Sequence, residues 1–240
     1  MRRIFTIIVV IAAVAALAVG LMVYTGSLRL NHPTQPVHGV DVSHYQGEID
    51  WPVLAGQNIQ FAFVKATEGS IYTDETFEAN WAGAQAAGLR VGAYHFFSYD
   101  SDGLSQAENY IATVPVLPGA LPPVIDVEFY GDYFRETPEA EDVLPQLTAM
   151  VDALRDHYGV DPILYVTEQS YALYVAGGFP DCDIWVRSTF RKPKLSDRRA
   201  WTFWQYTDRA KLPGYEGSET FIDMNVFHGT QAAFDAYPGT

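Results

Sequence analysis

The sequence is poor in cysteine: Cys182 is the single one in 240 residues, so no intrachain disulfide can form. We expect it to be a small buried residue beside the apolar run "IWV". The sequence also lacks HxH, HExxH and GxSxG patterns, which argues against zinc and serine hydrolases. No glycine-rich phosphate loop follows the first predicted strand, which disfavours a nucleotide-binding sheet. These absences predict a protein that uses neither a metal nor a cofactor.

Acidic residues are missing from the beginning of the chain and abundant in the rest. The first thirty residues hold three arginines and no acid, whereas the whole chain has a formal net charge of -14. The rest of the chain therefore has 12 basic and 29 acidic residues, which gives it a net charge of -17. A domain of this charge repels nucleic acid and anionic lipid headgroups. We expect no nucleic acid among its partners.

Charge of either sign is absent from residues 4–24, "IFTIIVVIAAVAALAVGLMVY". A helix of this length can cross the ~30 Å hydrocarbon core of a bilayer. Arg2 and Arg3 precede it, which predicts a cytoplasmic N-terminus and an exported remainder. A cleaved signal peptide, with "ALA" at residues 16–18 before the cut, is the alternative and would give a secreted protein.

Composition divides the chain into three parts. We expect residues 1–24 to form a cytoplasmic stub and a single transmembrane anchor in the cell membrane. Residues 25–37, "TGSLRLNHPTQPV", read as a short linker because they are rich in turn-forming residues. Residues 38–240 then form an extracytoplasmic domain, on the periplasmic or cell-wall side.

Short apolar runs predict eight strands, at residues 39–43, 61–67, 90–97, 122–129, 162–167, 183–189, 202–207 and 220–227. Helical patterns separate the early runs, at residues 76–87, 104–113 and 138–157, the last with Thr137 as N-cap and Pro138 in its first turn. This alternation predicts an α/β fold of parallel βα units, an irregular TIM-like (β/α) barrel whose late helices are reduced. An open doubly wound sheet is the alternative.

Each predicted strand starts with apolar residues and carries polar side chains near its carboxyl end. They are Asp41, Lys65, Thr67, His95, Asp126, Glu128, Thr167, Arg187, Ser188, Gln205, Asp223 and Asn225. In a barrel these ends meet on one face, where active sites are built. The pattern therefore predicts a polar pocket on that face.

Asp126 and Glu128 lie one residue apart in the predicted strand "PPVIDVEF". Residues i and i+2 of a strand point the same way, about 6.6 Å apart. Like charges at that distance raise one pKa, so one carboxyl can hold a proton while its neighbour stays ionised. Acid catalysis of glycoside hydrolysis uses such a pair. A salt bridge to Lys65 or Arg187 is the structural alternative.

Seven motifs occur in an order that resembles one enzyme family: "GVDVSHYQGEIDW" (39–51), "FVKATEG" (63–69), "GAYHF" (92–96), "PVIDVE" (123–128), "ILYVT" (163–167), "WQYT" (204–207) and "DMNVF" (223–227). The family is glycoside hydrolase family 25, the Chalaropsis-type lysozymes or N-acetylmuramidases. The resemblance covers residues 38 to 236 and implies an irregular (β/α) barrel. It also implies hydrolysis of the β-1,4 bond between N-acetylmuramic acid and N-acetylglucosamine in peptidoglycan.

The resemblance also implies roles for individual residues. Glu128 falls on the general acid, and Asp126 on the aspartate that orients the substrate's own N-acetyl group in a retaining reaction. Asp41 and Asp223 complete the catalytic set. The expected substrate-binding residues are Lys65, Glu68, Tyr94, His95, Tyr165, Trp185, Trp204, Gln205, Tyr206 and Asn225.

The expected partners are peptidoglycan glycan strands, and the membrane through the N-terminal helix, for a protein that acts as a monomer. Two other functions stay open for the same barrel. One is a non-catalytic module that binds cell-wall glycan, although such a module needs no proton donor. The other is a hydrolase of another N-acetyl polymer such as chitin.

Overall fold

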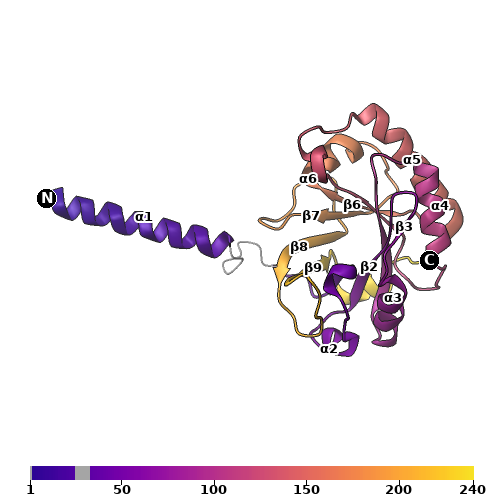
Figure 1. The fold of residues 1–240 in the computed structure, drawn as a ribbon, viewed down its shortest axis with the longest axis horizontal. Helices are drawn as coiled ribbons and strands as arrows, with labels where there is room; N and C mark the ends of the chain where they lie inside the picture. The colour runs from indigo at the N-terminus through magenta and orange to yellow at the C-terminus, as the bar shows by residue number, and fades with distance from the viewer. Residues whose placement is uncertain (1, 25–32) are drawn as a thin grey trace. The chain divides into compact units, whose positions relative to one another are not determined.

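The computed structural model describes residues 2–24 and 33–240, which belong to two separate compact units. The first unit holds helix α1 (Arg2–Tyr24), and the second, from Pro33 onward, holds all the strands (Figure 1). Residues 25–32 of the predicted linker lie outside the described residues.

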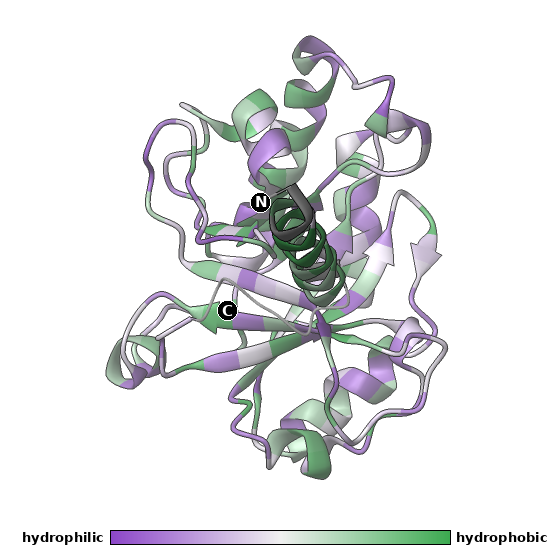
Figure 2. Cartoon of the chain, turned by 90° about the vertical axis from the view of Figure 1, so that its left-hand side faces the viewer, coloured by the Kyte–Doolittle hydropathy of each residue, from purple (hydrophilic) through white to green (hydrophobic). Residues whose placement is uncertain are grey.

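Helix α1 is apolar after its first two residues, Arg2 and Arg3 (Figure 2). Its segment Phe5–Met22 has a mean hydropathy of 2.8, and none of that segment is buried. By length and composition it can cross a membrane, and a signal sequence has the same properties.

Eight strands close into a barrel, which confirms the eight predicted strands and the barrel fold. They are β1 (His38–Val42), β2 (Phe61–Glu68), β4 (Arg90–Phe96), β5 (Val124–Val127), β6 (Ile163–Thr167), β7 (Ile184–Arg187), β8 (Phe203–Ala210) and β9 (Ile222–Phe227). Closure comes from β1, which pairs with β2 on one side and with β9 on the other. The two-residue strand β3 (Tyr72–Thr73) pairs with the end of β2.

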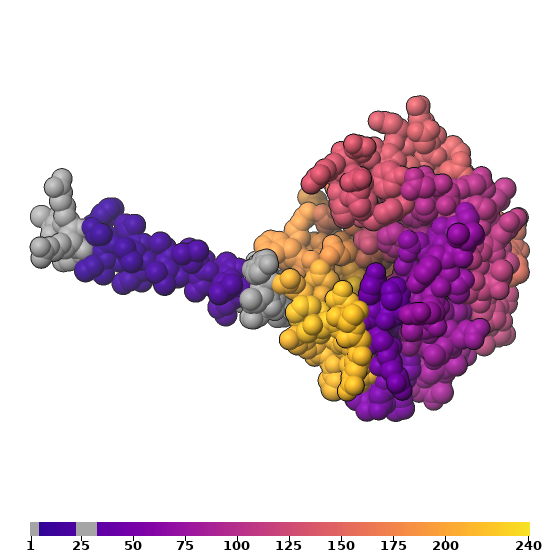
Figure 3. Space-filling model, in the orientation of Figure 1, coloured from indigo at the N-terminus to yellow at the C-terminus, as the bar shows by residue number. Residues whose placement is uncertain are grey.

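The expectation of parallel strands is wrong for the last one. β9 runs antiparallel to both β8 and β1, because residues 211–221 are too few for the crossover that a parallel pair requires. The C-terminal segment therefore lies directly against the early strands (Figure 3). Asp223 stands near the start of β9, not near its carboxyl end as expected, and the reversed direction places it opposite Asp41 of β1.

Helices cover the barrel unevenly, as expected. They are α2 (Trp51–Ala55), α3 (Phe77–Ala86), α4 (Gly103–Thr113), α5 (Ala140–Tyr158), α6 (Glu168–Ser170) and α7 (Gln231–Asp235), with short turns η1 (His44–Gln46), η2 (Gly131–Phe134) and η3 (Tyr171–Val175). Between β7 and β8 the structure has no helix in residues 188–202, all of which it describes. Helix α5 begins after Glu139, so the predicted start at Pro138 is wrong: the Pro138 carbonyl instead accepts a hydrogen bond from Tyr174 Oη at 2.7 Å.

Aromatic rings fill the inside of the barrel. Phe63 stacks on Trp185 with ring centroids 4.4 Å apart, and Phe61 and Phe203 pack edge to face beside them. Gly39 makes room for one of these rings, since a Cβ there would lie 2.3 Å from the Phe61 ring. These rings pack as tightly as a protein core and leave no room for polar groups in this part of the barrel interior. The polar site is therefore restricted to the carboxyl ends of the parallel strands.

Candidate active site

A cavity of about 340 Å³ opens at the carboxyl ends of the parallel strands. Nine of the predicted site residues line it: Asp41, Lys65, Tyr94, Asp126, Glu128, Tyr165, Trp185, Gln205 and Asp223. Counting Asp208 and Glu219, six carboxyl groups face the cavity against one ammonium group, that of Lys65. Such a cavity selects against anions and favours neutral polar ligands or groups that develop positive charge.

Asp126 and Glu128 form the buried pair that the strand pattern predicted. Asp126 is only 7% exposed, and its Oδ1 atom is buried with no hydrogen-bond partner in the described part of the chain. Burial and the neighbouring charge of Glu128 raise the pKa of Asp126 well above its usual range. Burial also raises the pKa of Glu128, while the positive charge of Arg187 opposes the rise. The pair therefore tends to share one proton.

The position of that proton differs from the sequence-based expectation. We expected Glu128 to hold it and Asp126 to stay ionised. Asp126 is the more deeply buried of the two, and no donor stabilises its Oδ1 atom as an anion. In the free protein the proton is therefore favoured on Asp126.

Asp41 and Asp223 form a second carboxyl pair on the opposite wall, where they are register partners of β1 and β9. Gln205 Nε2 lies between them, 3.0 Å from Asp41 Oδ2 and 2.9 Å from Asp223 Oδ2. Burial and the charge of Asp41 raise the pKa of Asp223 well above its usual range. Burial also raises the pKa of Asp41, but donated hydrogen bonds oppose the rise, the largest from Asn225. A proton shared by this pair is thus favoured on Asp223, and Asp41 is the one that ionises more readily.

Two aromatic side chains fix the direction of this hydrogen-bond network. Trp185 Nε1 can only donate, and it donates to Asn225 Oδ1 at 2.8 Å. The Asn225 amide nitrogen must then face Asp41, to which it donates at 2.6 Å. Tyr165 Oη donates to Gln205 Oε1 at 3.0 Å, which turns the Gln205 nitrogen toward the two acids. The predicted binding residue Asn225 therefore acts on the site through Asp41.

The salt bridge offered as a structural alternative for the paired acids is not formed. Lys65 Nζ donates to Glu68 Oε2 at 2.7 Å and lies 5.0 Å from the centroid of the Phe96 ring. Arg187 pairs with Asp208 at 2.7 Å. Glu68 does not line the cavity itself and contacts it only through Lys65.

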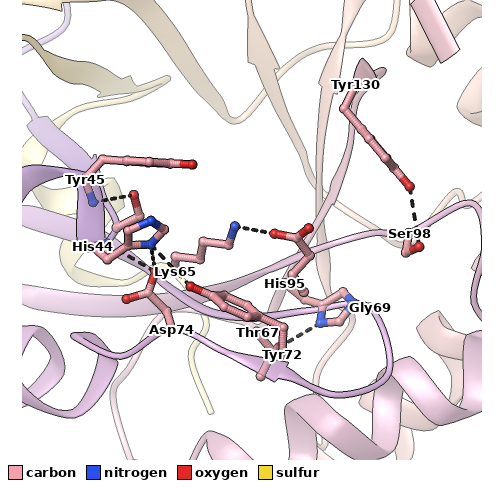
Figure 4. Close-up of polar contacts among 12 residues, drawn as sticks. His44, Tyr45, Lys65, Thr67, Gly69, Tyr72, Asp74, His95, Ser98 and Tyr130 are labelled. Carbon is pink, nitrogen blue, oxygen red and sulfur yellow. Dashed lines mark hydrogen bonds and ion pairs between the residues drawn. The ribbon is translucent and has the colours of Figure 1, made fainter. Parts of the chain in front are cut away.

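Three predicted binding residues lie away from the cavity. His95 is fully buried and lies 2.7 Å from Thr67 Oγ1 (Figure 4). Its other ring nitrogen lies 3.1 Å from Gln106 Oε1, and burial lowers its pKa to about 4. Trp204 and Tyr206 pack in the hydrophobic layer outside the barrel. The reason is strand alternation: if Tyr94 and Gln205 face inward, their sequence neighbours face outward. We withdraw these three from the binding set.

Sequence reasoning missed the rest of the cavity wall, which consists of Val42, Ser43, Tyr45, Gln46, Phe96, Asp208, Glu219 and Phe221. Tyr45 is 50% exposed, and its ring lies against His44 with centroids 4.0 Å apart. His44 is held in turn by the buried Asp74, 2.8 Å from His44 Nδ1 (Figure 4). Tyr45 belongs to the family motif of residues 39–51, so the sequence could have indicated it as a site residue. No local pattern marks Glu219 or Phe221.

Backbone contacts hold the 211–221 connection against this wall. The Glu219 amide donates to the Tyr45 carbonyl at 3.0 Å. A Cβ on Gly217 would lie 2.1 Å from the Tyr45 carbonyl oxygen, so only glycine permits this approach.

Comparison with known proteins agrees with this geometry. The family model "Glycosyl hydrolases family 25" matches residues 40–215. Lysozyme M1 of Streptomyces globisporus is 31% identical over 83% of this chain and 70% of its own length, and the uncharacterized protein YegX of Escherichia coli O157:H7 is 34% identical over 84% and 73%. A family 25 glycosyl hydrolase structure from Bacillus anthracis is 51% identical, covers 89% of this chain and 98% of its own, and superposes with a TM-score of 0.84. The predicted family and the prediction of a glycoside hydrolase are confirmed: the chain belongs to glycosyl hydrolase family 25.

Proposed function

We propose that the protein is a muramidase that cleaves the β-1,4 bond between N-acetylmuramic acid and N-acetylglucosamine in peptidoglycan. The observation that carries the proposal is the buried pair Asp126 and Glu128 at the cavity wall, because acid-catalysed glycoside cleavage uses one carboxyl that holds a proton and a second that assists it. The printed names of relatives support it: one is a lysozyme, and others are N,O-diacetylmuramidases.

In the proposed reaction Glu128 gives its proton to the glycosidic oxygen as the bond from that oxygen to the anomeric carbon breaks. The carbonyl oxygen of the substrate's own N-acetyl group forms the new bond to that carbon. Water then opens the ring intermediate, and ionised Glu128 takes a proton from this water. Configuration at the anomeric carbon is retained because it is inverted twice.

In these reaction steps Asp126 binds and orients the substrate's N-acetyl group. Its Oδ1 atom has no donor in the described structure, and the N–H of the substrate's N-acetyl group is a donor of the right kind. A hydrogen bond from that N–H favours ionised Asp126, so the shared proton moves to Glu128 when substrate binds. Asp126 also orients the carbonyl oxygen for attack. Substrate binding thereby protonates Glu128, the general acid.

The second carboxyl pair suits the charge that develops during cleavage. The anomeric carbon acquires positive character in the transition state, and Asp41 is the anion held on the facing wall. Gln205 and Asn225 keep that carboxylate in place. We infer that Asp41 and Asp223 stabilise the transition state electrostatically and transfer no proton to the leaving sugar.

Product analysis tests the proposed function. Peptidoglycan incubated with the protein should yield fragments whose new reducing ends are N-acetylmuramic acid, as read by mass spectrometry after borohydride reduction. Reducing ends at N-acetylglucosamine, or cleavage of chitin at a similar rate, would favour the hydrolase of another N-acetyl polymer. Tight glycan binding without any new reducing end would favour the non-catalytic module.

We infer that helix α1 remains attached as a membrane anchor, that residues 25–37 link it to the domain, and that the domain acts outside the cytoplasm. The support is the length of the uncharged segment, since the apolar part of a signal peptide is usually shorter, about 7–15 residues. The full-length protein should stay in the membrane fraction after a high-salt wash and be cut by protease added from outside. A soluble mature chain that begins near Val19 or later would contradict the anchor.

A further inference from the structure

The basic residues of the domain are concentrated in one stretch. Residues 33–240 contain twelve lysines and arginines, and six of these lie within residues 187–199, together with a single acid, Asp197. This stretch, which we call the basic segment, begins at the last residue of β7 and leads to β8. Because β7, β6 and β5 are parallel, the segment starts at the same end of the barrel as Asp126 and Glu128.

Half of the cations in the basic segment already have structural partners. Arg187 pairs with Asp208, and Arg191 pairs with Glu168. Arg199 donates to backbone carbonyl oxygens, among them that of Phe179 at 3.0 Å. These contacts hold the segment to the domain.

The other three cations, Lys192, Lys194 and Arg198, are exposed, and their side chains have no partner in the described part of the chain. Buried Pro193 and Leu195 alternate with the two lysines, so the backbone between them is anchored. The Lys194 amide adds a hydrogen bond to Glu168 Oε1 at 3.0 Å. Lys192 and Lys194 therefore present two unpaired positive charges from a fixed backbone beside Glu168, just beyond the carboxyl end of β6. Arg198 lies toward the amino end of β7, because the adjacent Arg199 donates to carbonyls that precede this strand.

We propose that the basic segment binds the carboxylates of the peptide stems on the glycan strand whose sugars occupy the cavity. This inference rests on the proposed function and adds the part of the substrate that the cavity itself cannot attract. Six carboxyl groups line the cavity, so an anionic stem is repelled there and is attracted to Lys192 and Lys194 at the same end of the barrel. An anionic lipid surface fits less well, because a membrane lying on this end would cover the cavity and exclude the glycan.

Kinetics with the full-length protein in detergent test this inference. The charge-removing variant is Lys192→Gln and Lys194→Gln combined, and its matched control, Lys192→Arg and Lys194→Arg combined, keeps both charges. The substrates are soluble peptidoglycan fragments and the same fragments with their carboxylates converted to methylamides by carbodiimide coupling. Thermal melts of both variants establish that they are folded.

On native fragments at low salt we expect the charge-removing variant to raise KM about fivefold, because two exposed ion pairs are individually weak and act together. We expect kcat to stay within about twofold, since neither lysine lines the cavity. The control should match the wild type, and on the methylamide fragments all three proteins should have similar KM values. High salt should remove the difference on native fragments.

An unchanged KM on native fragments would overturn the proposal, as expected if the segment faced lipid instead. An equal increase on both substrates would also overturn it, because that result is independent of the carboxylates. Co-sedimentation with insoluble peptidoglycan separates this inference from the proposed function. If the wild type released no reducing ends, the muramidase proposal would fail, while weaker sedimentation of the charge-removing variant would still support the segment's role.

Discussion

Replacing Glu128 by glutamine should lower kcat by about 10²–10⁴-fold, because the amide keeps the shape of the side chain and cannot give a proton to the glycosidic oxygen. The melting temperature should stay the same or rise, since the variant removes a carboxyl whose pKa is raised by burial. A purely structural Glu128 predicts the reverse, with lost stability and nearly normal turnover. The measurements are the rate of muropeptide release and a thermal melt.

Glu219→Gln is the matched control, because Glu219 is another cavity-lining glutamate but lies exposed on the 211–221 connection. It should reduce the rate far less than Glu128→Gln. If Glu128→Gln keeps more than about a tenth of the wild-type rate, less than the usual general-acid effect, Glu128 is not the acid.

Asp126→Asn separates the two members of the pair. While both carboxyls are present, the last shared proton leaves at raised pH because two adjacent anions repel each other. In Asp126→Asn only Glu128 can hold the proton, and no second anion raises its pKa. The basic limb of the pH–rate profile should therefore move to lower pH in the remaining activity. An unmoved basic limb would mean that Asp126 does not hold the shared proton.

Pattern reasoning placed the strands well because buried strands are marked locally, by apolar runs between turn residues. It also placed the two acids of β5 on one face, since side-chain direction follows from strand period alone. The order of the motifs then identified the family, which the family match confirms.

The binding-site errors arose because residues whose side chains face into the barrel were not separated from residues whose side chains face outward. Consecutive residues such as Trp204, Gln205 and Tyr206 cannot all face one cavity, and Gln205 alone does so. The reversed direction of β9 could have been inferred from the length of the 211–221 connection, which is too short for a parallel crossover. Burial depth is a tertiary property, and it decides that the shared proton is favoured on Asp126 over Glu128.

Replacing Asn225 by aspartate should make the stability of the protein strongly pH-dependent. Asn225 is fully buried, and its amide nitrogen donates to Asp41 Oδ1 at 2.6 Å. An aspartate here can still accept from Trp185 Nε1, but its second oxygen faces Asp41 Oδ1, where two acceptors repel each other unless one is protonated. The variant therefore binds an extra proton when folded.

The sign of the effect follows from proton linkage. A carboxyl whose folded pKa lies above its unfolded value binds more protons in the folded state, so the free energy of unfolding falls as pH rises. The loss starts near the unfolded pKa, about 4, and continues up to the folded pKa, at no more than about 1.4 kcal/mol per pH unit. Relative to the wild type, Asn225→Asp should thus be mildly affected at pH 4 and severely destabilised at pH 7.

Denaturant unfolding of wild type and variant between pH 4 and 7 measures this difference directly. Asn58→Asp is the control, because Asn58 is exposed and the same chemical change there should leave the pH dependence as in the wild type. A parallel pair of curves for wild type and Asn225→Asp would show that Asn225 does not donate to an ionised Asp41. The charge assignment on the second carboxyl pair, and with it the electrostatic role given to Asp41, would then be wrong.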